Sequence, residues 1–258
     1  MTFYKDFNKE PKDLLTKNFQ DAGKWKVESK FKGPKDTLYV NPQASNDGVN
    51  VDVEYNLASV PANLKLNVNP ELKSKLTTTY EAFGKLEVAV TDAFDYEVSW
   101  ENKFGDIAVN DKLTKEALEA GVAFSAAKGI SVGAGIVYNL EKSALAWSAG
   151  ARYSQKGVIV DVVTNALQKY TTGVQFQQNV AGQDMTVAFQ ADCGKDKGFK
   201  GTLAVETSCP VFAKNTVRVR VDNSFKWALV YITKLSDNWK AAVSVDAKLK
   251  PGLLLTLE

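Results

Sequence analysis

Histidine is absent from this sequence of 258 residues, and cysteine occurs only twice, at Cys193 and Cys209. Zinc sites, Ser-His-Asp triads and cysteine–histidine pairs depend on these two residue types, so most of that chemistry is excluded. Two cysteines that lie apart in a chain without a secretory signal are expected to be reduced packing residues. We therefore expect no catalytic residue, no metal site, no cofactor and no enzymatic activity.

Long runs of one kind of residue are missing as well. The 32 basic and 30 acidic residues are spread along the chain and give a formal charge of only +2, so we expect no nucleic-acid partner. No charge-free stretch reaches the roughly 18 apolar residues of a membrane-spanning helix. The chain reaches an acidic residue at Asp6, and its start has no apolar run of about 7 to 15 residues, so we expect no secretory signal. The apolar content of 45% nevertheless requires that the chain fold or insert into a membrane.

What the sequence has in abundance is an alternation of apolar and polar residues, which begins near residue 24. Between Val49 and Leu57 every second residue is apolar, and the residues between them are polar or charged. A β-strand with two unlike faces has this period of two. Between residues 130 and 153 small residues take the place of the charges on the second face. The chain after its first residues is therefore predicted to be all-β.

Turn-forming residues separate these stretches at regular intervals, as in an antiparallel meander. The chain after residue 24 has room for roughly 16 to 20 membrane-crossing strands of about 9 to 11 residues. A soluble sandwich or lipocalin-like barrel would turn the apolar face inward. A transmembrane β-barrel would turn it toward lipid and close on itself, because closure pairs every backbone group. Uniform strand length and aromatic residues near strand ends favour the transmembrane barrel.

Residues 3–19 follow a different pattern, that of an amphipathic helix. Its apolar side includes Phe3, Phe7, Leu14 and Leu15, and its polar side includes Lys9, Lys12 and Lys17. Pro11 removes a backbone donor, so we expect a break or kink near residues 8–11. Such a helix would lie either on the surface of a β domain or inside a wide barrel, with its apolar side on the wall. We divide the chain into a helix and hinge at 1–24 and a barrel at 25–258.

The segment from Tyr4 to Phe19, YKDFNKEPKDLLTKNF, resembles the amino-terminal helix of the mitochondrial voltage-dependent anion channels, or mitochondrial porins. Residues 221–224 are similar to the stretch before the antepenultimate strand of that family. The insertion signal of mitochondrial barrels, a polar residue, a glycine and two apolar residues near the C-terminus, is matched by Lys250, Gly252, Leu255 and Leu257. The resemblance implies an all-β transmembrane barrel of about 19 strands with its amphipathic helix inside the pore.

The resemblance also implies a function. It predicts a voltage-gated, weakly anion-selective pore for passive diffusion across the mitochondrial outer membrane. The partners would be membrane lipid and small anionic metabolites, including nucleotides in transit, and homo-oligomers are plausible. The family's Gly-Leu-Lys triplet is reduced to Gly84-Lys85-Leu86, so no nucleotide site is assigned. A protein-import pore of the same superfamily and a soluble β-barrel ligand-binding protein are the alternatives.

If the apolar face meets lipid, the other face of each strand lines the lumen. Charges facing lipid would cost about 2 to 4 kcal/mol each near the midplane, so the charged set belongs inside. Its candidates for anion selectivity are Lys26, Lys30, Lys32, Lys65, Arg218 and Arg220. The same face carries Lys85, Arg152, Lys240, Lys248, Glu28, Asp52, Glu54, Glu87 and Asp246. We expect more cations than anions on this wall, and helix lysines that narrow the pore, to give a mild preference for anions.

Overall fold

The computed structural model describes residues 2–20, 23–33, 37–57, 62–67, 73–80, 83–91, 93–195, 198–209, 212 and 215–257. Two short helical segments come first, the 3-10 helix η1 (Tyr4–Asp6) and the α-helix α1 (Lys9–Thr16). None of the helices in these ranges is long and apolar enough to cross a membrane.

Strands make up most of the rest of the described chain. They are β1 (Trp25–Ser29), β2 (Phe31–Lys32), β3 (Leu38–Ser45), β4 (Gly48–Leu57), β5 (Ala62–Asn67), β6 (Lys73–Tyr80), β7 (Gly84–Thr91), β8 (Tyr96–Phe104), β9 (Ile107–Thr114), β10 (Ala117–Ala127), β11 (Ile130–Asn139), β12 (Ala144–Gln155), β13 (Val158–Asn165), β14 (Lys169–Val180), β15 (Gln183–Gly194), β16 (Gly198–Ser208), β17 (Thr216–Asp222), β18 (Trp227–Lys234), β19 (Trp239–Asp246) and β20 (Pro251–Leu257).

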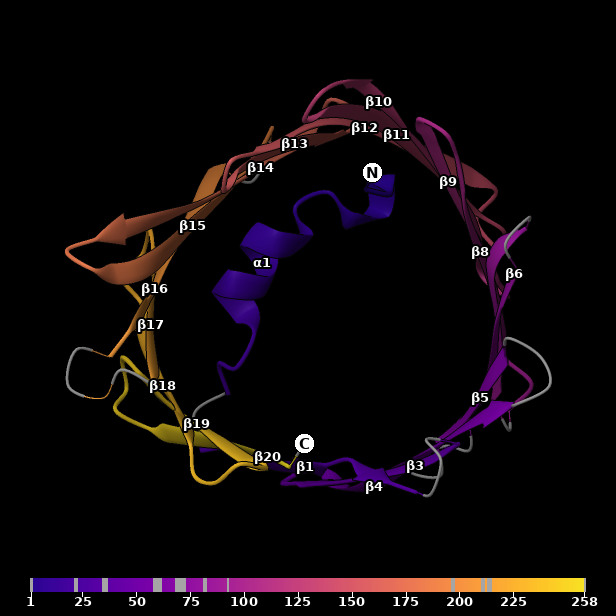
Figure 1. Cartoon of the computed structure of the whole chain (residues 1–258). Helices are drawn as coiled ribbons and strands as arrows, with labels where there is room; N and C mark the ends of the chain where they lie inside the picture. The colour runs from indigo at the N-terminus through magenta and orange to yellow at the C-terminus, as the bar shows by residue number, and fades with distance from the viewer. Residues whose placement is uncertain are drawn as a thin grey trace.

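The strands form one closed barrel. From β3 onward each strand pairs antiparallel with the next along the chain. Both β1 and β2 pair with β3, and only Lys30 separates them, so they are two parts of one strand. β1 also pairs parallel with β20, where Trp25 lies opposite Leu253. The result is a ring of 19 strands (Figure 1), which confirms the predicted fold. Because neighbours alternate in direction, an odd number of strands leaves one parallel pair, and β1–β20 is that pair.

The two faces of the barrel wall differ in kind. The inner face is identified by the N-terminal segment, since Phe7 packs against Ala108 of β9 and its register partner Ala123 of β10. Following the registers from this pair around the ring places Lys65 on the inner face and Val53 on the outer face. The outer face exposes many large apolar side chains. This confirms the predicted division of faces, and it is the reverse of the orientation in a soluble barrel.

The N-terminal segment lies inside the ring, with η1 against β9–β11 and α1 against β14–β16 (Figure 1). The two helices are separated at Asn8, whose backbone is left-handed with φ 65°. The expected break thus lies at the first residue of the expected range. Pro11 is the third residue of α1, where its missing N–H would have no partner within the helix, so regular helix continues through it. A helix on the outer surface of the domain is ruled out.

Candidate functional site: the lumen and its helix

The first part of the N-terminal segment lies on very small wall residues. Phe7 is 7% exposed between Ala108 and Ala123, and the half-buried Phe3 and Tyr4 join this cluster. The Tyr4 ring covers two glycines of β11, so close that a Cβ on Gly133 would lie 2.7 Å from its Cδ2 atom. A Cβ on Gly135 would lie 2.8 Å from its Cε1 atom. The ring can lie this close because the wall has no side chain there.

The second part, α1, packs in the same way farther along the wall. Leu14 and Leu15 contact Ala188 of β15 and Ala204 of β16, and all four side chains are buried. Gly173 of β14 leaves room for the helix start, because a Cβ there would lie 2.5 Å from Asn8 Oδ1 and 3.2 Å from Pro11 Cγ. We call this surface the helix groove: Ala108, Ala123, Gly133, Gly135, Gly173, Ala188 and Ala204. The four apolar helix residues singled out in the sequence all lie against it.

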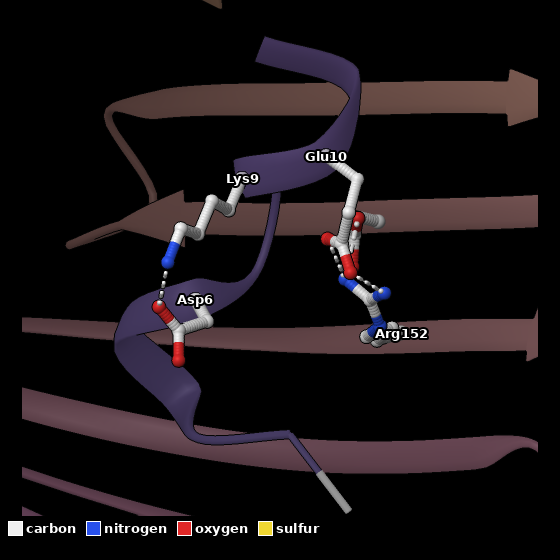
Figure 2. Close-up of polar contacts among 5 residues, drawn as sticks. Asp6, Lys9, Glu10 and Arg152 are labelled. Carbon is white, nitrogen blue, oxygen red and sulfur yellow. Dashed lines mark hydrogen bonds and ion pairs between the residues drawn. The ribbon is translucent and has the colours of Figure 1, made fainter. Parts of the chain in front are cut away.

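An ionic cluster fixes the start of α1 to the wall. Arg152 of β12 donates from Nη1 and Nη2 to the two carboxylate oxygens of Glu10, each at 2.8 Å (Figure 2). The same guanidinium pairs with Asp161 of β13 at 3.3 Å, and these two wall residues are 4% and 0% exposed. Burial raises the pKa of Glu10, but the hydrogen bonds and charge of Arg152 outweigh it and leave that pKa below its usual value. The helix start is thus held by a buried arginine that also pairs with Asp161 of the wall.

Two arginines of β17 hold the other end of α1. Arg218 donates from Nη1 to the carbonyl oxygen of Lys17 at 2.6 Å and also pairs with Glu206. Arg220 donates to the carbonyl oxygen of Leu15 at 2.9 Å, and its guanidinium lies 4.3 Å from the centre of the Phe19 ring. The last carbonyl groups of a helix lack partners within it and carry partial negative charge, which favours cations there. Both arginines, predicted to serve selectivity, therefore also position the helix.

The opposite part of the wall is charged, and most of its charges in the described strands are paired. We call it the charged wall, the inner face of β1–β8. The ion pairs within β1–β7 include Lys26–Glu28, Lys30–Glu54 at 3.9 Å, Lys65–Asp52 at 2.8 Å, Lys65–Glu54 at 3.5 Å, Lys75–Glu87 at 2.7 Å and Lys85–Glu87 at 2.8 Å. On β8, Glu101 pairs with Lys5 and Glu97 with Lys112. Lys32, at its edge, is exposed and also interacts with a neighbour. Lys26, Lys30 and Lys65, which were predicted to attract anions, thus have acidic neighbours that offset their charge.

The lysines of the N-terminal segment have fewer ion-pair partners than those of the charged wall. Lys9 lies 3.4 Å from Asp6 (Figure 2), whereas the exposed side chains of Lys12 and Lys17 make no ion pair within the ranges that the structure describes. Lys12 lines a cavity of about 490 Å³ between α1 and β15–β19. The charged residues around that cavity are Lys12, Lys200, Arg220, Lys226, Lys248, Asp192, Asp222 and Asp246. The structure thus brings Lys12 and Arg220 together and places the charged wall apart from them.

The residues of the expected insertion signal lie at the last strand. Lys250 precedes β20, and Leu255 and Leu257 point outward beside Val27 and Ser29 of β1. Gly252 faces the lumen, where a Cβ would lie 2.7 Å from Ser244 Oγ and 2.8 Å from Gln20 Cβ. The Ser244 hydroxyl donates to the carbonyl oxygen of Gln20 at 3.1 Å. A glycine is needed at this position because the chain leaving α1 passes over it.

Sequence reasoning assigned no role to the helix groove or to the Glu10–Arg152–Asp161 cluster. A signal for the groove was present, since small residues replace charges on the inner face between residues 130 and 153. Small side chains on the water-facing side of a strand indicate that another part of the chain comes close. The partner could not be identified, because Glu10 and Arg152 are separated by 142 positions in the sequence.

Comparisons with known proteins identify no family for this chain. No protein-family model matches the chain, and no curated protein matches it. Among 20 solved chains that match is a mutant of the porin of Rh. blastica, which is 10% identical with a TM-score of 0.49. That match covers 89% of this chain and 94% of the porin chain. At this level of similarity no family follows, and the description of the barrel rests on its own strand registers.

Proposed function

We propose that this chain forms a water-filled pore through which ions and small anionic metabolites diffuse across a membrane. The observation that carries the proposal is the division of the wall into a charged, polar inner face and a large apolar outer face. Closure leaves no unpaired strand edge, so the barrel can lie in hydrocarbon while its lumen holds water. A soluble ligand-binding barrel would need the opposite orientation.

The proposed selectivity is a weak preference for anions. Its main source is the N-terminal segment, because Lys12 and Lys17 stand in the lumen without ion-pair partners in the described part of the chain. Arg220 adds positive charge beside them, whereas Asp6 and Glu206 offset part of the charge of Lys9 and Arg218. Lys26, Lys30 and Lys65 contribute less, since acidic residues offset their fields. A wide lumen with a small excess of positive charge concentrates anions, nucleotides included, without a binding pocket.

We further propose that the pore closes partially under voltage. Moving one elementary charge across the full membrane potential changes the free energy by about 2.3 kcal/mol per 100 mV, so displacement of a few helix charges is enough to bias two states. The resemblance of residues 4–19 to mitochondrial voltage-dependent anion channels supports this gating and a place in the mitochondrial outer membrane. Membrane lipid and a second copy of the chain are the partners it suggests.

Single-channel recording in a planar bilayer under a salt gradient tests these proposals. We expect large conductance steps, a mild anion preference and partial closure at both polarities. Replacing Lys9, Lys12 and Lys17 together by glutamate is expected to abolish or reverse the preference, because the change falls in the narrowed lumen. Glutamates at the turn residues Lys115, Lys128 and Lys156 alter the net charge equally and serve as the control.

Three outcomes contradict the proposal. An unchanged reversal potential in the helix variant would remove the N-terminal segment from selectivity. Cation preference with block by mitochondrial presequence peptides would point to a protein-import pore. A protein that stays in solution without detergent and never inserts would end the membrane interpretation.

A further inference from the structure

One side chain does not fit the apolar outer face. Along β9 the even-numbered residues face the lumen, since Ala108 contacts Phe7 and Lys112 pairs with Glu97 at 3.0 Å. Asp111 therefore points outward. When the registers are followed through all described strands, Asp111 is the one charged residue at an outward-facing position.

The register partners of Asp111 and its neighbours on the same face of β9 are apolar. It lies near the middle of β9 (Ile107–Thr114), opposite Trp100 of β8 and Ala120 of β10. Val109 and Leu113 are its neighbours on the same face of β9. Within the described ranges its carboxylate has neither an ion pair nor a hydrogen bond. A barrel in a bilayer thus presents this carboxylate, without a partner of its own, at the depth of the lipid chains.

An unpartnered carboxylate at that depth is unfavourable, and an apolar residue would remove the penalty. Ionisable groups inside membranes are paired with a group of opposite charge or with a hydrogen-bond donor where they persist. A partner group can approach Asp111 from the β10 side, because Ala120 there is small. The large Trp100 side chain lies on the β8 side.

We propose that Asp111 binds a lysine or arginine carried at mid-membrane depth by a transmembrane helix of another protein. A second copy of this chain does not supply the matching charge, since its outward-facing positions in the described strands carry no lysine or arginine. Only helices and closed barrels cross lipid, and a single helix is narrow enough to lie along the wall beside β8–β10. The proposal rests on the barrel lying in a bilayer, as the proposed function does.

The test uses the whole protein, dye-labelled and reconstituted in phosphatidylcholine vesicles, with synthetic leucine–alanine helices long enough to span them. Three peptides differ only at the central residue, which is lysine, leucine or glutamate. Binding is measured by energy transfer from peptide to barrel. We expect the lysine peptide to bind about tenfold more tightly than the leucine peptide, which corresponds to about 1.4 kcal/mol. The glutamate peptide should show no such gain.

Asp111→Leu is expected to abolish the preference for the lysine peptide, and Asp111→Asn to weaken it. The luminal variant Glu97→Gln, on the neighbouring strand, removes one negative charge from the other face and should keep the preference. Equal binding of all three peptides, or a preference that survives Asp111→Leu, overturns the proposal. Energy transfer between barrels that Asp111→Leu abolishes, without any preference for lysine, would also overturn it in favour of self-association.

Channel recordings on the same vesicles separate this proposal from the proposed function. Asp111→Leu should conduct like the unmodified protein, because the residue does not face the lumen. A protein that conducts but shows no lysine preference refutes the docking site alone, whereas failure to insert refutes the membrane pore as well.

Discussion

The charged wall and the helix groove lie in the same barrel and have the same strand geometry, yet they differ in what covers their inner faces. The charged wall carries long side chains whose lysines and carboxylates pair with each other beside water. The helix groove carries glycine and alanine, and the N-terminal segment supplies the side chains that it lacks. One part of the lumen is therefore lined by its own wall, and the other by the first residues of the chain.

The difference shows where stability and function depend on individual residues. Exposed ion pairs contribute little each, because water already solvates the separated charges. The groove depends on contacts that leave no spare room, and on a buried arginine shared between wall and helix. Substitutions of equal size should therefore change the free energy of unfolding less in the charged wall than in the helix groove.

The largest effect is expected from Arg152→Leu. It leaves the carboxylate of Asp161 fully buried without its partner, which typically costs about 3 to 5 kcal/mol in the free energy of unfolding. Lys26→Leu on the charged wall should cost less than about 1 kcal/mol, because Lys26 and its partner Glu28 each keep about a third of their side-chain surface exposed. Urea titration in lipid vesicles compares the two variants, and the double variant with Asp161→Leu should recover much of the loss. Equal costs for the two single variants would remove the proposed distinction.

A smaller effect is expected from Gly173→Leu, which acts on docking of the helix. The three atoms nearest to a Cβ at this position all belong to Asn8 and Pro11, so a side chain here overlaps the N-terminal segment first. The helix should leave the groove, and trypsin should cleave after Lys12 and Lys17 about tenfold faster or more, as for a loss of about 1.4 kcal/mol of docking free energy. Conductance should rise. Ser99→Leu, on the inner face of β8, is the matched control and should leave both quantities unchanged.

The smallest effect is expected from pH. Because the pKa of Glu10 in the folded state lies below its ordinary value of 4.5, its ion pair stabilises docking fully above that value. The contribution is lost as the pH falls further and Glu10 takes up a proton. A protease that is active in acid, for example pepsin, should therefore cleave the N-terminal segment more readily at about pH 3 than at about pH 5. Glu10→Gln should lose part of this dependence; an identical profile would exclude Glu10 as its source.

The faces of the strands could be predicted from the sequence because the signal is local. In β4, residues 49–57 alternate one by one, and that alternation alone fixes which side chains share a face. The amphipathic character of residues 3–19 is local in the same sense. The number of strands was bounded by length but reached 19 only through the resemblance, since turns and strands vary in length.

The arrangement inside the lumen could not be predicted in this way. Tyr4 meets Gly133, and Glu10 meets Arg152, through closure of the whole ring rather than through any neighbouring pattern. Arg218 and Arg220 were recognised as luminal, but their bonds to the carbonyl groups of Lys17 and Leu15 depend on where the helix lies. Position along a strand shows which way a residue points, and the contacts it makes depend on the whole fold.

The parallel pairing of β1 with β20 has a consequence for assembly. Every other strand pair joins segments that follow each other along the chain, so those hairpins can form as the sequence emerges. The β1–β20 pair, the seam of the barrel, joins Trp25 to Leu253 and cannot form before the last strand exists. Until then two edges with unpaired backbone groups stay open to any other strand. A barrel of this kind must therefore be shielded from aggregation for the whole of its synthesis, and the seam is the last step to complete.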